Sequence, residues 1–192
     1  MRGMSAAPEE GNRDRILAAA RDQFAARGFR GTTMRAIAAE AGVDVALLAH
    51  YFGNKDGLFA EAITFPRSPT ALLAEVFAFP RDEQGEQLTR RYLGLWEDPT
   101  TGRQMQVLTR SVIGDEAGAA HLRTVVGGLL GDEGVEAALE GRWTGFVTAM
   151  AHLAGVAVAR HLARVPLLST MDFEAVVART APAVQLHLDT PD

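Results

Sequence analysis

The sequence of 192 residues contains no cysteine and only one lysine, Lys55. Without cysteine, the chain can form no disulfide, no thiolate nucleophile and no cysteine-ligated metal centre. No segment alternates apolar and polar residues in the manner of a half-buried strand, whereas helical spacing of apolar residues is present almost throughout. We therefore predict an all-α fold.

Long hydrophobic segments are also missing. The longest apolar-looking run, residues 146–159, contains Thr148, His152 and Gly155 and is shorter than the roughly 18 apolar residues that a membrane-spanning helix needs. The N-terminal residues 1–15 lack the apolar stretch of a signal peptide. We expect a cytoplasmic protein that does not bind membranes.

The net charge of −5 disfavours a nucleic-acid partner at first sight, but the charge is unevenly distributed. Residues 13–35 carry six arginines and two aspartates, a local charge of +4, and the excess of acidic residues lies after Thr64. A local basic region matters more for nucleic-acid binding than the total charge.

Residues 32–55 are the most informative part of the chain. They read as two short helices joined by a tight turn at Gly42, which supplies the positive φ that such a turn requires. Thr33 and Asp44 are good N-cap residues for the two helices, and Ala38 is small where the second helix must pass over the first. The pattern predicts a helix-turn-helix, whose second helix enters the major groove of DNA.

Helical periodicity continues to the C-terminus. Helices are expected from Asn12 to about Arg27, from Asn54 to about Phe65, from Ser68 to Pro80, after the connector 81–86, from Asp98, from Gly114, from Trp143 to Val165, and from Thr170 to Leu188. The last two stand out, because a long apolar stripe is backed by small residues and both sides can be packed closely. We expect these two helices to hold a homodimer together.

The three N-terminal helices together with the segment HYFGNKDGLF resemble the tetracycline-repressor (TetR) family of bacterial transcriptional regulators. The resemblance is motif-specific from about Arg13 to Ile63. It implies a helix-turn-helix DNA-binding domain over 12–53, a helical effector-binding and dimerisation domain over 54–190, and a flexible arm over 1–11. It further implies a homodimeric repressor that a small effector releases from a palindromic operator in double-stranded DNA.

The resemblance also implies which residues contact DNA. The candidates are Thr33, Arg35, Asp44, Val45, Ala46, Ala49, His50, Tyr51 and Lys55. Thr33, Tyr51 and Lys55 would contact phosphates, and His50 could reach the backbone. Arg35 would reach a guanine or a phosphate.

The base-reading positions depart from the family pattern. Relatives often carry a proline at the position of Val45 and an aromatic residue or histidine at that of Ala49. Val45, Ala46 and Ala49 have no hydrogen-bonding side chain, so direct readout would depend on Arg35 and on thymine methyl contacts, with DNA shape supplying the rest. Two interpretations without a DNA contact remain open: Arg35 could pair with Asp44 or Glu40, and Lys55 could be an ordinary surface lysine.

Aromatic residues and methionines of the later helices predict a mostly apolar effector pocket. The candidates are Phe77, Tyr92, Trp96, Met105, Trp143, Phe146 and Met150, with Gln104 and Thr109 as possible polar contributors. At helical spacing, the same residue types also fit an ordinary core.

Catalytic and metal-binding patterns are not found. The histidines are not paired at the spacing of a helical metal site, and no catalytic triad order, phosphate-binding glycine loop or carboxylate pair stands out. We expect no metal, no cofactor and no enzymatic activity. The alternative to a repressor is a helical small-molecule-binding or protein-interaction module with weakened DNA recognition, and binding to the upstream promoter would separate the two.

Overall fold

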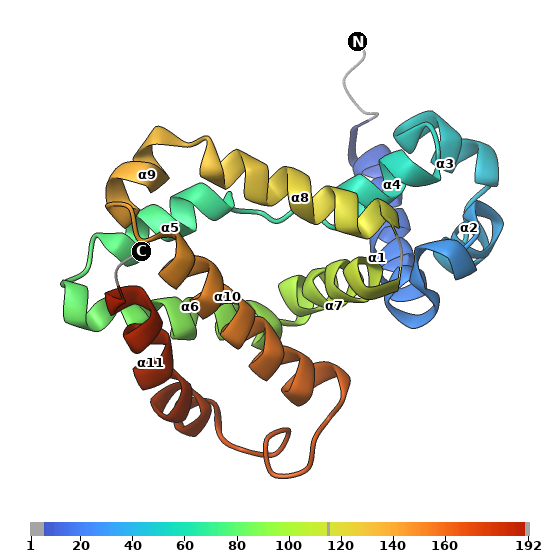
Figure 1. The fold of residues 1–192 in the computed structure, drawn as a ribbon. Coiled ribbons are helices and arrows are strands. Elements are labelled where there is room, and N and C mark those ends of the chain that lie inside the picture. The colour runs from blue at the N-terminus through green and yellow to red at the C-terminus, as the bar shows by residue number, and fades with distance from the viewer. Residues whose placement is uncertain (1–5, 115, 191–192) are drawn as a thin grey trace. The chain divides into compact units, whose positions relative to one another are not determined.

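The computed structural model describes residues 6–114 and 116–190, and within these residues the chain forms helices and no strand (Figure 1). The all-α prediction is therefore confirmed for the described chain. The elements are α1 (Ala6–Gly31), α2 (Met34–Ala41), α3 (Val45–Phe52), α4 (Lys55–Ala62), α5 (Pro69–Phe77), the 3₁₀ turn η1 (Arg81–Glu83), α6 (Gln84–Glu97), α7 (Pro99–Gly114), α8 (Glu116–Leu130), α9 (Glu133–Leu139), α10 (Trp143–Ala157), the π-helical turn η2 (Val158–Leu162) and α11 (Phe173–Asp189).

The helices form two compact units. The first extends to Phe65 and includes Arg103–Leu122; the second comprises Pro66–Gly102 and the described chain from Arg123 onwards. This division differs from the expected boundary after residue 53, because α4 packs against α1 in the first unit. Each unit contains part of α7 and part of α8.

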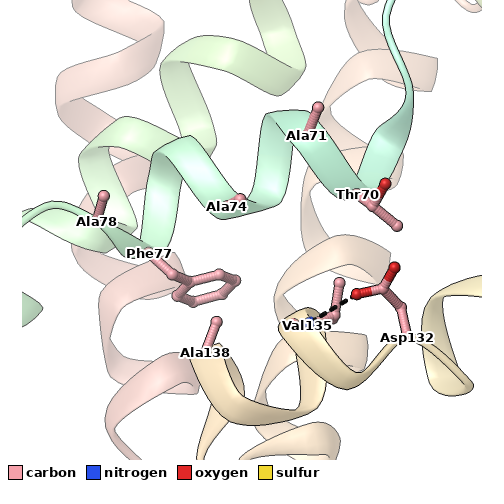
Figure 2. A pocket seen from close by; sticks show the side chains of 9 residues that line it. Thr70, Ala71, Ala74, Phe77, Ala78, Asp132, Val135 and Ala138 are labelled. Carbon is pink, nitrogen blue, oxygen red and sulfur yellow. Dashed lines mark hydrogen bonds between the residues drawn. The ribbon is translucent and has the colours of Figure 1, made fainter.

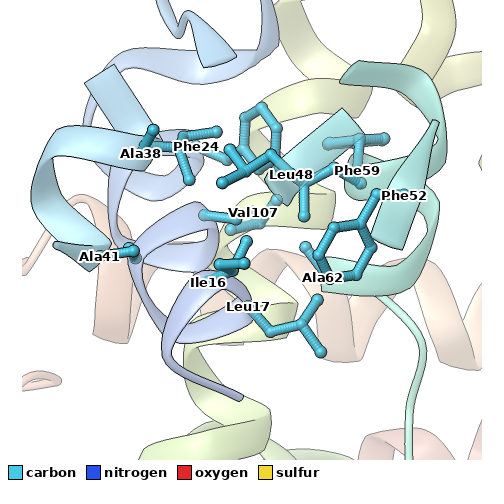
Figure 3. Close-up of a cluster of buried hydrophobic side chains, with 14 of the residues drawn as sticks. Ile16, Leu17, Phe24, Ala38, Ala41, Leu48, Phe52, Phe59, Ala62 and Val107 are labelled. Carbon is cyan, nitrogen blue, oxygen red and sulfur yellow. The ribbon is translucent and has the colours of Figure 1, made fainter. Parts of the chain in front are cut away.

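The first unit is built around an apolar core to which all four N-terminal helices contribute (Figure 3). Its buried side chains include Ile16, Phe24, Ile37, Ala38, Leu48, Phe52, Leu58, Phe59 and, from α7, Val107. Phe59 meets the ring of Phe24 edge-on, with the ring centroids 5.2 Å apart. The three-helix unit and α4 are therefore one folded body.

The predicted helix starts are confirmed at four positions. Thr33 accepts a hydrogen bond from Ala36 N at 3.1 Å, and Asp44 accepts one from Ala46 N at 2.7 Å. Asn54 caps α4 in the same way, and Ser68 caps α5 just before Pro69. Each cap satisfies a backbone N–H that would otherwise lack a helical partner.

Two glycines are required by the backbone around α3. Gly42 has φ 66° and ψ 41°, the left-handed conformation predicted for the turn between α2 and α3. A Cβ on Gly57 would lie 2.3 Å from the carbonyl oxygen of Phe52. The end of α3 and the first turn of α4 thus approach so closely that only glycine fits.

The N-terminal helix starts earlier than predicted but is interrupted at its predicted end, where Gly28 has the non-helical angles φ 69° and ψ 175°. It starts at Ala6, so Asn12 is not an N-cap, and the described part of the expected arm, residues 6–11, is helical. Pro8 falls in the first turn, where a missing N–H removes no helical hydrogen bond. Residues 1–5 lie outside the described part of the chain.

Other helix boundaries also differ from the predictions. The structure ends α4 at Ala62 and adds the short helix α9, capped by Asp132, where several glycines mask a helical pattern. The last helix begins at Phe173 and not at Thr170, because Asp172 accepts a hydrogen bond from Glu174 N and caps it.

The second unit is arranged around α6, against which α10 and α11 pack. Two glycines permit this close packing: a Cβ on Gly85 would lie 2.6 Å from Gln185, and one on Gly145 would lie 2.2 Å from the carbonyl oxygen of His187. The apolar stripe of α10 is therefore largely used inside the subunit.

We predict that Gly42→Ala lowers the free energy of unfolding by about 1–2 kcal/mol, because a side chain in the left-handed region clashes with its own backbone. Gly11 is a matched control: it is exposed in α1 and a Cβ there would meet nothing within 4 Å. Gly11→Ala should stabilise the protein by about 0.5–1 kcal/mol. Urea unfolding followed by circular dichroism measures both; equal stability of Gly42→Ala and the parent would contradict the turn assignment.

Candidate nucleic-acid interface and ligand cleft

The third helix has one anchored face and one open face. Leu48 is fully buried and Phe52 is 7% exposed. On the open face lie Val45, Ala46, Ala49 and His50, all exposed. The predicted base-reading residues are thus brought together on one surface that has no role in the core.

Arg35 lies on α2 and is exposed. Both alternative partners of its guanidinium are engaged elsewhere: Glu40 accepts a hydrogen bond from Gln23, and Asp44 caps α3. Within the described chain, Arg35 makes no hydrogen bond or ion pair. Its charge is available to a ligand.

Lys55 is the first residue of α4, where unpaired backbone N–H groups favour an anion. Its Nζ lies 4.4 Å from the centroid of the Phe29 ring. This cation–π contact holds the ammonium group at the helix start and leaves its donors free for a phosphate oxygen. The sequence indicated Phe29 only as a core residue, so its role in placing Lys55 was not predicted.

Thr33 and Tyr51 complete the set of predicted phosphate contacts. Thr33 uses its hydroxyl oxygen as an acceptor in the α2 cap and keeps the O–H as a donor. Tyr51 is half-buried, and its ring lies 5.5 Å from that of His50. Asp44, by contrast, uses its carboxylate to cap α3, and a negative charge repels phosphate; we therefore assign it to positioning α3.

Part of the basic charge of α1 is used inside the first unit. Arg13 pairs with Glu61, and Arg21 donates to the carbonyl oxygen of Ala62 at 3.0 Å. Burial lowers the pKa of Arg21 from its usual value. The local charge of +4 therefore overstates what the surface offers to DNA.

A cleft of about 470 Å³ lies between α5 and α9 in the second unit (Figure 2). It is lined by Thr70, Ala71, Ala74, Phe77, Ala78, Asp132, Gly134, Val135 and Ala138. Of the seven predicted pocket residues, only Phe77 belongs to this lining. The lining is mostly apolar, with Thr70 and Asp132 as its polar side chains, and the effector-binding role of the seven residues stays a prediction.

The other six candidates have different surroundings. Tyr92, Trp96, Met105, Trp143, Phe146 and Met150 do not line the cleft. Trp96 is 4% exposed and stacks on His161, with ring centroids 5.4 Å apart, while burial raises the pKa of Tyr92. Of the six, Trp96, Met105 and Phe146 are buried, whereas Tyr92, Trp143 and Met150 are partly exposed.

Two candidates lie behind the cleft. Phe146 meets the ring of Phe77 with centroids 6.3 Å apart, and Trp143 meets Phe146 at 6.1 Å. The predicted polar contributor Gln104 is buried in the first unit and donates to the carbonyl oxygen of Thr64 at 2.7 Å. It is a structural residue there, and neither Gln104 nor Thr109 lines the cleft.

Histidines separated in the sequence meet in the fold. His152 on α10 and His187 on α11 have ring centroids 5.6 Å apart. In the described chain, however, no three histidine or carboxylate side chains gather as metal ligands would. None of the described helices is both long and apolar enough to cross a membrane.

The buried and exposed faces of α3, its capped start and the turn before it define a helix-turn-helix head. Residues 16–62 match the family model of the bacterial regulatory proteins of the tetR family. Residues 82–188 match the tetracyclin repressor-like C-terminal domain. The chain belongs to the TetR family and is a transcriptional regulator of this type, which confirms the resemblance.

Individual relatives agree with this membership. A stretch of 44 residues is 54% identical to the HTH-type transcriptional regulatory protein RaaS of Mycobacterium tuberculosis. This stretch covers 23% of this chain and 20% of that protein. A solved TetR-family regulator from Streptomyces coelicolor is 27% identical, with 98% and 100% of the two chains covered and a TM-score of 0.61.

More distant structures share the fold. A transcriptional regulator from Rhodococcus is 19% identical, with 92% and 93% of the chains covered and a TM-score of 0.56. The hemolysin II transcriptional regulator HlyIIR is also 19% identical, with 91% and 97% covered and a TM-score of 0.56.

We predict that Lys55→Ala and Tyr51→Phe weaken binding to all DNA sequences about equally, whereas Arg35→Ala also relaxes sequence preference. Phosphate contacts position a protein on DNA, and base contacts specify the site. If Arg35 is bidentate to guanine, its loss should cost about 1–3 kcal/mol of discrimination at one base pair. The charge-matched control is Arg164→Ala, at an exposed arginine in the loop after η2.

Binding to a library of operator variants measures all four proteins. An unchanged base preference for Arg35→Ala would move Arg35 to the phosphate contacts. Weakening by Arg164→Ala to the same degree as Lys55→Ala would show only a general charge effect.

Proposed function

We propose that this chain is a homodimeric repressor that binds a palindromic operator through α3 and is released by a small, largely hydrophobic effector. The observation that carries the proposal is the open face of α3, which is exposed and has no structural role. Beside it stand the capped starts of α2 and α4, where Thr33 and Lys55 can each bind a phosphate.

Base readout on this face depends on few groups. Val45, Ala46 and Ala49 offer methyl groups, which fit thymine methyls in the major groove. Exposed hydrogen-bonding side chains close to them in the chain include Arg35 on α2 and His50 on α3, and we assign base contact to Arg35. We therefore expect a modest specificity, with part of it coming from the shape and deformability of the operator.

Dimerisation through α10 and α11 is proposed from the apolar residues that they leave exposed. Val147 is 52% exposed and Leu186 is 68% exposed, while Phe146 and Leu153 are buried inside the subunit. A permanent dimer interface should bury about 2,000 Å² or more in total. The outer faces of the two helices, and not the whole predicted stripe, would form it.

We predict that Val147→Asp and Leu186→Asp each shift the protein towards monomer, because a charge would be buried in the interface. Leu130→Asp is the control, since Leu130 is also 52% exposed but lies on α8. Val177 is unsuitable for this purpose, because it is 1% exposed and its replacement would disrupt the subunit core. Sedimentation at micromolar concentration measures the change; a monomeric parent protein would refute the dimer.

Effector release requires only a modest coupling between the two sites. A tenfold change in operator affinity corresponds to about 1.4 kcal/mol of coupling free energy. A ligand in contact with Phe77 would shift the Phe77 ring against Phe146 on α10. We propose that α10 forms part of the dimer interface, so this shift would reach the partner subunit. Such a ligand would favour a dimer whose two α3 helices no longer match the groove spacing.

We predict that binding to DNA from upstream of the protein's own gene is strongly salt-dependent. A dimer that neutralises about six phosphates should give a slope near −5 in a plot of log affinity against log salt. Gel-shift titrations at several salt concentrations measure the slope. No binding to that DNA, or binding without salt dependence, would favour the alternative of a module with weakened DNA recognition.

A further inference from the structure

The geometry points to a ligand class for the α5–α9 cleft: a small protonated amine with an apolar body. Its ammonium group would lie between Thr70 and Asp132, and its apolar part would lie along α5 towards Phe77. Such an amine would be the effector of the proposed function. Binding of the amine to the cleft can be tested alone, and only its release of operator DNA rests on the proposed function.

One wall of the cleft is built from small apolar side chains. Ala71 and Ala74 on α5 and Ala78 at its C-cap are exposed, whereas Leu73 and Val76 are buried on the other side of the helix. Exposed helix surfaces usually carry long polar side chains, and alanine leaves that volume open. The cleft volume of about 470 Å³ is within the range of small-molecule sites, about 300–1,000 Å³.

An aromatic ring stands at one end of this wall and is held in place from behind. Phe77 projects from α5 towards Ala138 of α9 (Figure 2). The Arg142 guanidinium carbon lies 5.9 Å from its ring centroid, and Phe146 packs against it. Arg142 is itself fixed by donation to the carbonyl oxygen of Leu139 at 2.8 Å. A preformed aromatic wall reduces the ordering that a ligand would have to cause.

The other end of the cleft carries hydrogen-bond acceptors. Asp132 caps α9 with Oδ1, which accepts from Val135 N at 3.0 Å, while Oδ2 accepts no hydrogen bond from the described residues. The Thr70 side chain lies on the opposite wall (Figure 2). An ammonium group has donors only, so a free carboxylate oxygen and a hydroxyl oxygen are suitable partners.

The charge around the cleft also favours a cation. Residues 132–141 contain four acidic residues and no basic one. Of these acids Glu140 pairs with Arg81, and Arg67 pairs with Glu75. Arg142 keeps its positive charge over the Phe77 ring, at the end of the cleft away from Asp132. A local negative potential attracts cations and disfavours carboxylate ligands.

Three probes of similar shape and different charge test the inference on the full-length protein. They are 2-phenylethylamine, which is protonated at neutral pH, the neutral 2-phenylethanol and the anionic 3-phenylpropionate. Calorimetric titration without DNA should give a Kd for the amine at least tenfold lower than that for the alcohol, with the carboxylate weakest. For fragments of this size we expect high-micromolar to millimolar values.

Two variants assign the binding to the cleft. Asp132→Asn removes the charge but keeps a good N-cap for α9, so folding is preserved and the amine should fall to the affinity of the alcohol. Ala74→Leu fills the cleft and should weaken amine and alcohol alike by at least tenfold. Ala60→Leu, an exposed alanine on α4, should change neither.

Tryptophan fluorescence gives an independent reading. Trp143 donates its indole N–H to Glu136 on α9, so its emission should change when a ligand enters beside that helix. Three results would overturn the inference: equal amine affinity of the parent and Asp132→Asn, unchanged binding to Ala74→Leu, or no saturable binding below about 10 mM. Binding that follows the variants while DNA stays bound would support the site and refute only its role in release.

Discussion

A helix of eight residues has almost no stability of its own in water, so the position of α3 depends on the side chains that anchor its inner face. Leu48 and Phe52 provide this anchor, and each buried side chain contributes about 1.5–3 kcal/mol. The turn at Gly42 and the close contact at Gly57 then fix both ends of the helix. Because these four positions hold α3 in place, residues on its outer face can be replaced without unfolding the domain. The same fold can therefore present different residues to DNA.

The basic residues of this acidic chain divide into two groups with different tasks. Arg13 and Arg21 hold α1 to α4, whereas Arg35 has no partner among the described residues and Lys55 is held over Phe29. Counting charges along the sequence cannot separate these groups, because pairing is decided by residues distant in the chain. Arg35 and Lys55 belong to α2 and α4, the helices that precede and follow α3 in the chain, and we propose that both contact DNA.

The local features of the fold were predictable because they depend on neighbouring residues. The caps at Thr33 and Asp44 and the turn at Gly42 follow from side-chain chemistry within a few positions, and the structure confirms them. The cleft between α5 and α9 was not predictable in the same way. It is formed by exposed alanines of α5 and by the unpredicted helix α9, and no periodicity distinguishes an alanine beside a cleft from one at the surface. The candidates chosen from the sequence were aromatic residues and methionines instead, and three of these seven residues, Trp96, Met105 and Phe146, are buried.

The central claim is that two α3 helices of a dimer lie in successive major grooves of operator DNA. Hydroxyl-radical footprinting of the bound upstream fragment tests it most directly, because it maps protected backbone at single-nucleotide resolution. The claim predicts two equivalent protected segments related by a dyad, with centres about 34–36 Å apart or a multiple of that distance. A single asymmetric protected segment, or no protection at concentrations that saturate a gel shift, would contradict it.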